Sequence, residues 1–559
     1  MKADLCEADQ STASRFLRHL SRRGVRYFFG NAGTDFPPII EALSKGPIDI
    51  EPVVVPHENV AVAMAYGVTL VTGQPQVVMV HVGLGTANAL LGVFNAARQH
   101  IPMILVAGRT PVLEQGRLGA RNNYINWAQE MFDQGGMIRE MVKWDYELRD
   151  PAQITEVVDR ALAVCQSEPA GPVYLVLPRE VLATDAPDNN TDSLGRQAPA
   201  LLGLPPEEQL ALCAKWLGEA ERPLIITADT GRTRSGFEAL TQLSTDCGIP
   251  VVQYRPRFLN VPCSLPTHAG YDPTALVPDA DLILVVDCDV PWLPETASPA
   301  AKTRIVHIGR DPLYLDYPMR SFRSDLTLQG DTASILRRLN GKSPVPIKRS
   351  AWLDKATRRR PVATNGEARL TNQYVSRCIA DAMDQQCILV NEYTFSLEHL
   401  RIDEPGRYFS HSPAGGLGWA MGTALGIRMA RPDQTVFATV GDGTYMFGNP
   451  TPTHFVSASR RLPFITVIYN NRRWAAVHRA TLSMYPRGAA AMRNEPVFAT
   501  LEPAPDYERI VEASGGLGLR VENAADIPAA LEQAMNAVRN QGRQAVINVL
   551  TEPEYTRTS

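Results

Sequence analysis

Acidic and amide side chains follow two neighbouring apolar stretches in the C-terminal third of the chain. Gly441-Asp442-Gly443 comes directly after the expected strand Val436–Val440, and Asn470-Asn471 follows the expected strand Phe464–Ile468. Open α/β sheets bind ligands at the carboxyl ends of their strands, so we expect both groups at one sheet edge. A carboxylate, an amide oxygen and a backbone carbonyl suit Mg²⁺ and, through it, a diphosphate.

The spacing of these two groups is specific. A GDG alone also occurs where an aspartate simply caps a helix, but here 26 residues separate Gly443 from Asn470. This pairing resembles the signature of thiamine-diphosphate enzymes, in which a GDG is followed at about this distance by two asparagines. The resemblance implies that Asp442, the Asn471 side chain and the backbone carbonyl of Arg473 bind Mg²⁺.

Two further segments of the C-terminal third agree with this resemblance. Asn391–Thr394 is similar to a strand end whose hydroxyl binds the cofactor diphosphate, and Ala414–Trp419 is similar to the loop behind the cofactor. The resemblance implies that Leu417 wedges the cofactor into a bent shape and that the Gly415 carbonyl meets its aminopyrimidine. The implied cofactor contacts are Glu58, Thr394, Gly415, Leu417, Gly441, Asp442, Gly443, Asn471 and Ala475.

A candidate catalytic carboxyl group lies in the N-terminal third. Glu58 opens an apolar helical stretch between two glycine-rich segments, Phe29–Thr34 and His81–Asn88. This order resembles the pyrimidine-binding domain of the pyruvate oxidase, acetolactate synthase and benzoylformate decarboxylase group, and the resemblance covers essentially the whole chain. It implies that Glu58 protonates the pyrimidine, so that an ylid forms, attacks a carbonyl carbon and leads to an enamine. The alternative is a glutamate that only stabilises a helix N-terminus.

His81 discriminates between members of this group. Benzoylformate decarboxylase carries histidine at this position and serine where this chain has Thr34, whereas many acetolactate synthases carry a small hydroxyl residue in place of the histidine. We therefore take Glu58, His81 and Thr34 as catalytic candidates, with His81 moving protons during decarboxylation. The chain departs from the pattern at Pro294, where benzoylformate decarboxylase has a second histidine. A structural histidine beside the turn is the alternative.

The substrate pocket is expected directly after the metal ligands. Trp474, Ala476 and Val477 follow Arg473 in the chain, and Trp292 of the middle third is a further expected neighbour. Their apolar side chains would accept a branched or aromatic 2-oxo acid.

Short apolar strands alternate with longer helical stretches along the whole chain. Continuously apolar strands such as Val77–Val80 and Leu282–Val286 are typical of parallel sheets with helices on both faces. Two stretches rich in proline and polar residues, 184–202 and 341–366, predict linkers. We expect three doubly wound, mostly parallel α/β domains: a pyrimidine-binding domain over 1–185, a Rossmann-like central domain over 203–340 and a diphosphate-binding domain over 367–559.

Composition and charge restrict the partners. A chain of 559 residues is too long for one hydrophobic core, and a net charge of −4 gives no basic surface for nucleic acid or membrane. No apolar run reaches the roughly 18 residues that span a bilayer. Eight scattered cysteines without a CxxC pair predict reduced, mostly buried thiols in a cytoplasmic protein. The middle third lacks the basic–acidic stretch of flavin-binding relatives, so we expect no FAD.

The sequence leaves three functions open. The leading prediction is a carbon–carbon lyase or transferase that uses thiamine diphosphate and Mg²⁺ to decarboxylate or ligate small 2-oxo acids, similar to benzoylformate decarboxylase. The alternatives are an acetolactate-synthase-like carboligase and a cofactor-binding subunit without catalysis; intact Glu58, Asp442 and Asn471 argue against the last. In relatives the two cofactor-binding domains meet across a subunit interface, which implies a homodimer or homotetramer.

Overall fold

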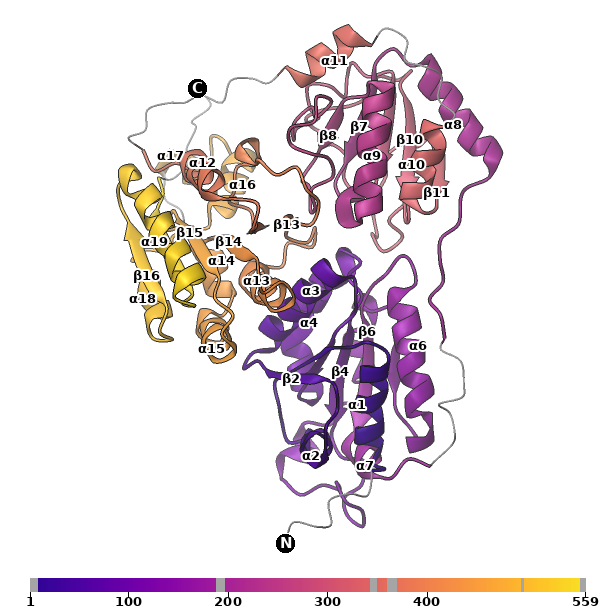
Figure 1. The fold of residues 1–559 in the computed structure, drawn as a ribbon, viewed down its shortest axis with the longest axis vertical. Helices are drawn as coiled ribbons and strands as arrows, with labels where there is room; N and C mark the ends of the chain where they lie inside the picture. Colours follow the sequence, from indigo (N-terminus) through magenta and orange to yellow (C-terminus); the bar gives the residue numbers. More distant parts are fainter. Residues whose placement is uncertain (1–8, 188–196, 342–348, 359–368, 494–496, 553–559) are drawn as a thin grey trace.

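The computed structural model describes residues 9–187, 197–341, 349–358, 369–493 and 497–552. Three sheets follow one another along the chain, each parallel throughout and covered by helices (Figure 1). The predicted class, α/β with three doubly wound parallel-sheet domains, is confirmed. The central strands, such as β3 (Val77–Val80), are buried along their whole length, because helices exclude water from both faces of each sheet.

The N-terminal sheet has the strand order β2-β1-β3-β4-β6-β5. Its strands are β1 (Tyr27–Gly30), β2 (Glu51–Val54), β3, β4 (Ile104–Arg109), β5 (Asp145–Glu147) and β6 (Val173–Pro178). Its helices are α1 (Thr12–Arg22), α2 (Pro37–Lys45), α3 (Glu58–Thr72), α4 (Val82–Arg98), α5 (Ile125–Ala128), α6 (Ile154–Gln166) and α7 (Arg179–Ala183).

The C-terminal sheet repeats the same order, as β13-β12-β14-β15-β17-β16. Its strands are β12 (Cys387–Asn391), β13 (Tyr408–Ser410), β14 (Thr435–Gly441), β15 (Ile465–Asn470), β16 (Leu517–Val521) and β17 (Ala545–Leu550). Its helices are α12 (Asn372–Ala382), α13 (Trp419–Ala430), α14 (Asp442–Phe447), α15 (Pro450–Arg460), α16 (Ala475–Met484), α17 (Ala489–Arg493), α18 (Tyr507–Glu512) and α19 (Ile527–Asn540). The two outer domains therefore share one topology.

The central sheet has the order β11-β10-β9-β7-β8, which is the 2-1-3-4-5 order of a doubly wound sheet read from its other edge. Its strands are β7 (Pro223–Thr227), β8 (Val251–Gln253), β9 (Leu282–Val286), β10 (Arg304–Gly309) and β11 (Leu326–Gln329), with helices α8 (Glu207–Glu219), α9 (Arg234–Cys247), α10 (Thr332–Asn340) and α11 (Ser350–Thr357).

Helix α11 lies inside the stretch 341–366 that the sequence predicts to be a linker. Its Trp352 is buried in the central domain, and the Trp352 indole nitrogen donates a hydrogen bond to the Pro223 carbonyl at 2.7 Å. This stretch is therefore not a linker throughout. Residues 342–348 and 359–368 lie outside the described residues, as do residues 188–196 of the other expected linker.

The N-terminal and C-terminal domains contact each other through α3 and α13 (Figure 1). A Cβ on Gly67 would overlap the Thr423 carbonyl, and one on Gly426 would overlap the Met64 carbonyl. The Thr423 hydroxyl donates to the Ala63 carbonyl at 3.3 Å. Since only glycine permits this approach, the two glycines bring the helix backbones into direct contact.

The cysteines agree with the sequence prediction. All seven among the described residues are free, and all except Cys378 are buried; Cys6 lies outside the described residues. Among the helices of the described residues, none combines the length and apolar character required to cross a membrane.

Candidate active site between the outer domains

Asp442 and Asn471 lie at one edge of the C-terminal sheet. Strands β14 and β15 are parallel neighbours, and Gly441 is in register with Tyr469. Asp442 therefore begins α14 at the same level at which β15 ends. The loop after β15 is tight: Arg472 has a left-handed φ of 58°, and Asn471 Oδ1 accepts a hydrogen bond from the Arg473 amide at 3.1 Å.

The Asp442 carboxylate is buried, and no cationic side chain of the described residues forms an ion pair with it. The residue is 2% exposed, and its Oδ1 accepts from the Gly443 amide at 2.9 Å. Its Oδ2 has no hydrogen-bond partner among the described residues. Burial raises the pKa of Asp442 to about 6, although the amides of Gly443, Arg472 and Arg473 act to lower it. A buried oxygen of this kind fits a bound cation.

Thr394 supplies a second unpartnered oxygen at this edge. It follows β12, the strand next to β14, and its methyl group lies 3.8 Å from the position of a Cβ on Gly441. Its hydroxyl is buried without a hydrogen-bond partner among the described residues. The neighbouring Asn470 is used differently, since its side-chain amide donates to the Asn548 side chain at 3.1 Å. Thr394 and Asp442 thus leave two oxygens free for a ligand.

Glu392 holds the loop that contains Gly415 and Leu417. Its carboxylate accepts hydrogen bonds from the Gly418 and Ala420 amides at 2.8 and 2.7 Å. Burial raises the pKa of Glu392 to about 7. Gly415 itself is left-handed, with φ 71°. The sequence prediction missed this role, and the signal available was a glutamate placed two residues before Thr394.

Glu58 is buried in the N-terminal domain and is bound by two amide side chains. Asn31 donates to its Oε1 at 2.9 Å, and Asn88 donates to its Oε2. Both asparagines come from the glycine-rich segments on either side of Glu58 in the sequence. The carboxyl group is therefore held in a fixed orientation at the beginning of α3.

His81 pairs with an aspartate that the sequence prediction missed. Its Nδ1 lies 2.6 Å from Asp35 Oδ1, and its Nε2 lies 3.3 Å from the Gln129 side-chain nitrogen. Thr34 has an exposed side chain on the same loop, and its carbonyl accepts from Arg179 at 2.9 Å. The available signal was the acidic residue directly after Thr34.

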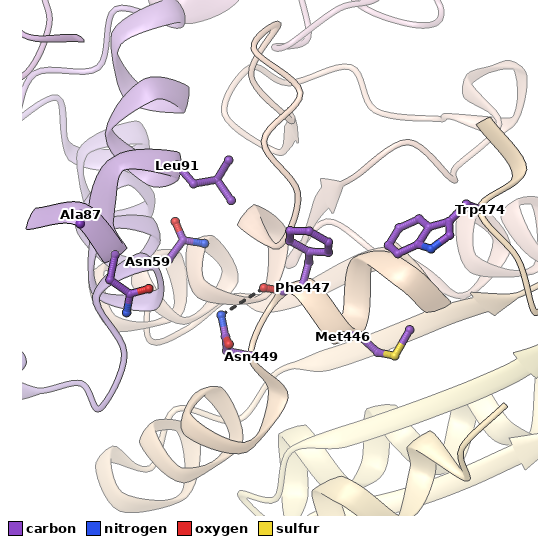
Figure 2. A pocket seen from close by; sticks show the side chains of 8 residues that line it. Asn59, Ala87, Leu91, Met446, Phe447, Asn449 and Trp474 are labelled. Carbon is purple, nitrogen blue, oxygen red and sulfur yellow. Dashed lines mark hydrogen bonds between the residues drawn. The ribbon is translucent and has the colours of Figure 1, made fainter. Parts of the chain in front are cut away.

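A cavity of about 550 Å³ separates the two domains. In Figure 2, α3 and α4 face α14 and Trp474 across it. It is lined by Asn59, Ala87, Asn88, Leu91, Met446, Phe447, Asn449 and Trp474. Asn88 also binds Glu58, and the Trp474 ring packs against Gly443, so both halves of the candidate site adjoin this cavity.

The expected pocket residues do not all lie near the cavity. Trp474 lines the cavity, and Ala475, Ala476 and Val477 form the first turn of α16 directly after it. Trp292 instead belongs to the buried core of the central domain, with its ring edge-to-face against Phe322 at 5.4 Å. The expectation that Trp292 neighbours this pocket is not met, because its apolar ring is used in domain packing.

The two outer domains share one parallel-sheet topology. One carries a buried aspartate with an oxygen that no described residue binds, and the other carries a buried glutamate. This combination defines the class of thiamine-diphosphate-dependent enzymes. The family comparison agrees. Residues 10–137 match the thiamine pyrophosphate enzyme N-terminal TPP binding domain, 210–339 its central domain and 392–549 its C-terminal TPP binding domain. The chain belongs to this family, and the family membership predicted from the sequence is confirmed.

Similar proteins include both groups that the sequence resembles. The chain is 24% identical to the acetolactate synthase isozyme 3 large subunit of Escherichia coli, with 95% of this chain and 93% of that protein covered. It is 26% identical to benzoylformate decarboxylase of Pseudomonas aeruginosa, with 93% and 96% covered. A thiamine diphosphate-dependent 4-hydroxybenzoylformate decarboxylase from Rhodococcus jostii has a similar fold, with a TM-score of 0.79, 22% identity and coverage of 98% and 100%.

Proposed function

We propose that this chain uses thiamine diphosphate and Mg²⁺ to decarboxylate a 2-oxo acid or to join the resulting acyl group to a second carbonyl compound. The observation that carries the proposal is the buried Asp442 carboxylate with its unpartnered Oδ2. An uncompensated buried charge costs on the order of several kcal/mol. Asp442, Asn471 and the Arg473 carbonyl would hold Mg²⁺, and Mg²⁺ would hold the diphosphate.

Further residues around the sheet edge would hold the rest of the cofactor. The unpartnered Thr394 hydroxyl would donate to the diphosphate, and the fixed Gly415 loop would contact the pyrimidine. When bound, the cofactor supplies an electron sink for the bond broken next to the carbonyl. The remaining proposed contacts are Leu417, Gly441, Gly443 and Ala475.

Glu58 and His81 would move protons. The two amides that bind Glu58 would keep its carboxyl group in place to hold a proton against the pyrimidine ring. His81 would exchange its proton at Nε2, because its Nδ1 faces the Asp35 carboxylate. Groups of this kind typically contribute roughly a hundred- to ten-thousand-fold in rate. Thr34 would contact the substrate from the same loop as Asp35.

The substrate would lie against Trp474, Ala476 and Val477, close to the cavity between the outer domains. The domain limits 1–185, 203–340 and 367–559 stay part of the proposal, as does the cytoplasmic location. We propose a homodimer or homotetramer on the basis of the resemblance alone. The structure contains one chain, and the contact between its two cofactor-binding domains lies within that chain.

An acetolactate-synthase-like carboligase is the second candidate. It is favoured by the likeness to the Escherichia coli synthase subunit and by Pro294, which stands where benzoylformate decarboxylase has a histidine. Two groups favour both enzymatic candidates over a subunit without catalysis. They are Glu58, which is buried and hydrogen-bonded, and Asp442, which has a carboxylate oxygen available to a cation.

The deciding experiment is a panel of aliphatic and aromatic 2-oxo acids, incubated with the protein, thiamine diphosphate and Mg²⁺. Released CO2 and coupled hydroxyketone are scored separately, with and without an added acceptor aldehyde. Aldehyde with CO2 supports the decarboxylase, and hydroxyketone formed without added aldehyde supports the carboligase. If the cofactor is shown to bind but no 2-oxo acid gives a cofactor-dependent product, the remaining candidate is a cofactor-binding subunit without catalysis.

A further inference from the structure

Tyr393 has an unusual backbone beside the candidate cofactor site. Its φ of 72° lies in the left-handed region, which bulky residues adopt only at a cost in backbone strain. Its ring lies against the His411 ring, with centroids 3.6 Å apart. Its hydroxyl lies 2.9 Å from the position that a Cβ on Gly415 would take. Although stacked in this way, Tyr393 remains 55% exposed, so part of its ring is open to a ligand.

A loop of the central domain brings an arginine to this aromatic pair. Strand β13 is the edge strand of the C-terminal sheet, and its Phe409 forms an antiparallel bridge with Phe258 of the central domain. The Ser410 amide also donates to the Arg257 carbonyl at 2.9 Å. In this antiparallel register Pro256 lies opposite His411, so Arg255 is one residue away, and the Arg255 guanidinium acts to lower the pKa of both His411 and Tyr393.

Arg255 is exposed and has no acidic partner. Its guanidinium lies 5.6 Å from the centroid of the Tyr254 ring, and no carboxylate among the described residues pairs with it. Its φ of 46° is also left-handed, so two strained residues, Arg255 and Tyr393, adjoin the same histidine. A free guanidinium beside an open aromatic surface is suited to a carboxylate.

The loop that carries Arg255 is rigidly held. Two residues further on, the buried Arg257 donates two hydrogen bonds of 2.6 Å to Asp229 and one of 3.0 Å to Asp289. All three charged groups are buried, and both carboxylates form ion pairs with Arg257. Arg257 therefore fixes the loop to the central domain. Arg255, two residues away, has its backbone in this fixed loop.

We propose that Arg255, Tyr393 and His411 form an anion subsite for the carboxylate of a second carbonyl substrate, the acyl acceptor. The proposal rests on the proposed function and specifies its acceptor as a small 2-oxo acid. A guanidinium bound to the carboxylate of the donor would stabilise that group before CO2 is lost and would slow the reaction. The subsite is therefore suited to a carboxylate that remains on the product.

The reaction is balanced without an oxidant. The donor 2-oxo acid loses CO2, and its carbonyl carbon forms a bond to the carbonyl carbon of the acceptor. The acceptor's carbonyl oxygen takes up one proton and becomes a hydroxyl, so the products are CO2 and a 2-hydroxy-3-oxo acid. His411 would serve this subsite as a neutral hydrogen-bonding ring, because burial lowers its pKa to about 3, with a further lowering from Arg257 and Arg255.

The test compares two acceptors, 2-oxobutanoate and propanal, which share an ethyl group and differ by the carboxylate. With the full-length holoenzyme and the best donor from the panel, Arg255→Gln should raise the KM for 2-oxobutanoate as acceptor at least tenfold. The KM for propanal should stay unchanged. Arg234→Gln is the matched control, because Arg234 is an exposed arginine of the same domain.

Three results would overturn the subsite. Equal increases for both acceptors would indicate a distorted loop, a higher KM for the donor alone would assign Arg255 to the donor, and unchanged values would remove its role. The proposed function fails separately if the panel gives no cofactor-dependent product at all, and it stands as a decarboxylase if the panel gives aldehyde without carboligation. Calorimetric binding of 2-oxobutanoate to the Glu58→Gln holoenzyme, with and without Arg255→Gln, then decides the subsite: weaker binding supports it, and equal binding overturns it.

Discussion

Nδ1 of His81 lies 2.6 Å from Oδ1 of Asp35, and Oδ2 of the same carboxylate accepts a hydrogen bond from the Val82 amide at 3.1 Å. A Cβ on Gly33 would overlap the His81 ring, and one on Gly108 would overlap the Asp35 carboxylate. Two glycines therefore let this pair pack closely against the backbone. Because Asp35 accepts at Nδ1, Nε2 of His81 is the nitrogen that a substrate would contact, in place of the Gln129 side-chain nitrogen that lies 3.3 Å from it.

Replacing His81 tests the proton transfer. His81→Ala should slow aldehyde release by at least one order of magnitude, within the range typical of a general acid–base group. The fraction of acyl group captured by an added acceptor aldehyde should rise, because protonation no longer competes as effectively. Product ratios with and without excess acceptor provide the measurement. An unchanged rate and ratio would make His81 a structural residue and favour the acetolactate-synthase-like candidate.

Asp35 should act only through His81. Asp35→Asn should lower kcat by roughly tenfold or more while leaving the KM for the 2-oxo acid and the affinity for the cofactor nearly unchanged. In the His81→Ala background, the same substitution should have little further effect, since the group that it positions is gone. Independent, multiplying losses in the double variant would contradict this dependence, and Asp35→Glu tests whether a carboxylate alone restores kcat.

Glu58→Gln separates cofactor binding from cofactor activation. Glutamine can keep a hydrogen bond to one of the two asparagines, so binding of thiamine diphosphate should change little. Exchange of the cofactor's thiazolium C2 proton, followed by NMR, should fall sharply, because glutamine cannot hold the required proton. Near-wild-type exchange in this variant would show that Glu58 is not the activating group. Asn31→Ala provides a comparison in which the carboxyl group is kept but loses one partner.

Asp442→Asn should change metal binding and metal-free stability in opposite directions. The asparagine side chain keeps an acceptor for the Gly443 amide, and it removes a buried negative charge that no cation of the described residues pairs with. The metal-free variant should therefore unfold at a higher temperature than the wild type, whereas Mg²⁺-dependent cofactor binding should be lost. Calorimetry and thermal unfolding, each with and without Mg²⁺, measure the two effects. A less stable metal-free variant would mean that the carboxylate already has a stabilising partner.

Exposed apolar side chains agree with the homo-oligomer that the resemblance predicts. Large apolar side chains are exposed in two segments, one in each outer domain. They are Val112, Leu113, Leu118, Tyr124, Trp127 and Phe132 in the first, and Met484, Tyr485, Met492, Val497 and Phe498 in the second. Contiguous exposed apolar patches mark protein interfaces, so these two segments are the surfaces that we expect an oligomer to bury. Sedimentation under assay conditions should give an active dimer or tetramer, and an active monomer would contradict the prediction.

Strand and motif patterns predicted more of the fold than of the contacts within the site. Continuously apolar strands such as β3 and β9 (Leu282–Val286) coincide with the expected ranges, because burial on both faces leaves a clear pattern. Strand β2 (Glu51–Val54) was not predicted, since three of its four residues are exposed and it contains a proline. Asp442 and Glu58 were identified by spacing and resemblance, but Asp35 and Glu392 were not, because their partners are brought together only by the tertiary fold.

Glu392 should make stability depend on pH through the loop that it holds. Its folded-state pKa of about 7 lies above the ordinary value of 4.5, so its contribution is fully present below pH 4.5 and is lost as the pH rises through 7. A shift of this size corresponds to about 3 kcal/mol, taken as an order of magnitude. Glutamine is neutral like the protonated carboxyl group, and its carbonyl oxygen still accepts from one of the two amides, Gly418 or Ala420, that bind Glu392. Thermal unfolding of the cofactor-free protein between pH 5 and 8 should therefore show a smaller decline for Glu392→Gln than for the wild type. The variant should be the more stable protein at pH 8 and nearly equal at pH 5. A parallel decline of both proteins would show that Glu392 does not titrate in this range, and a less stable variant at pH 8 would show that the ionised carboxylate is needed to hold the loop.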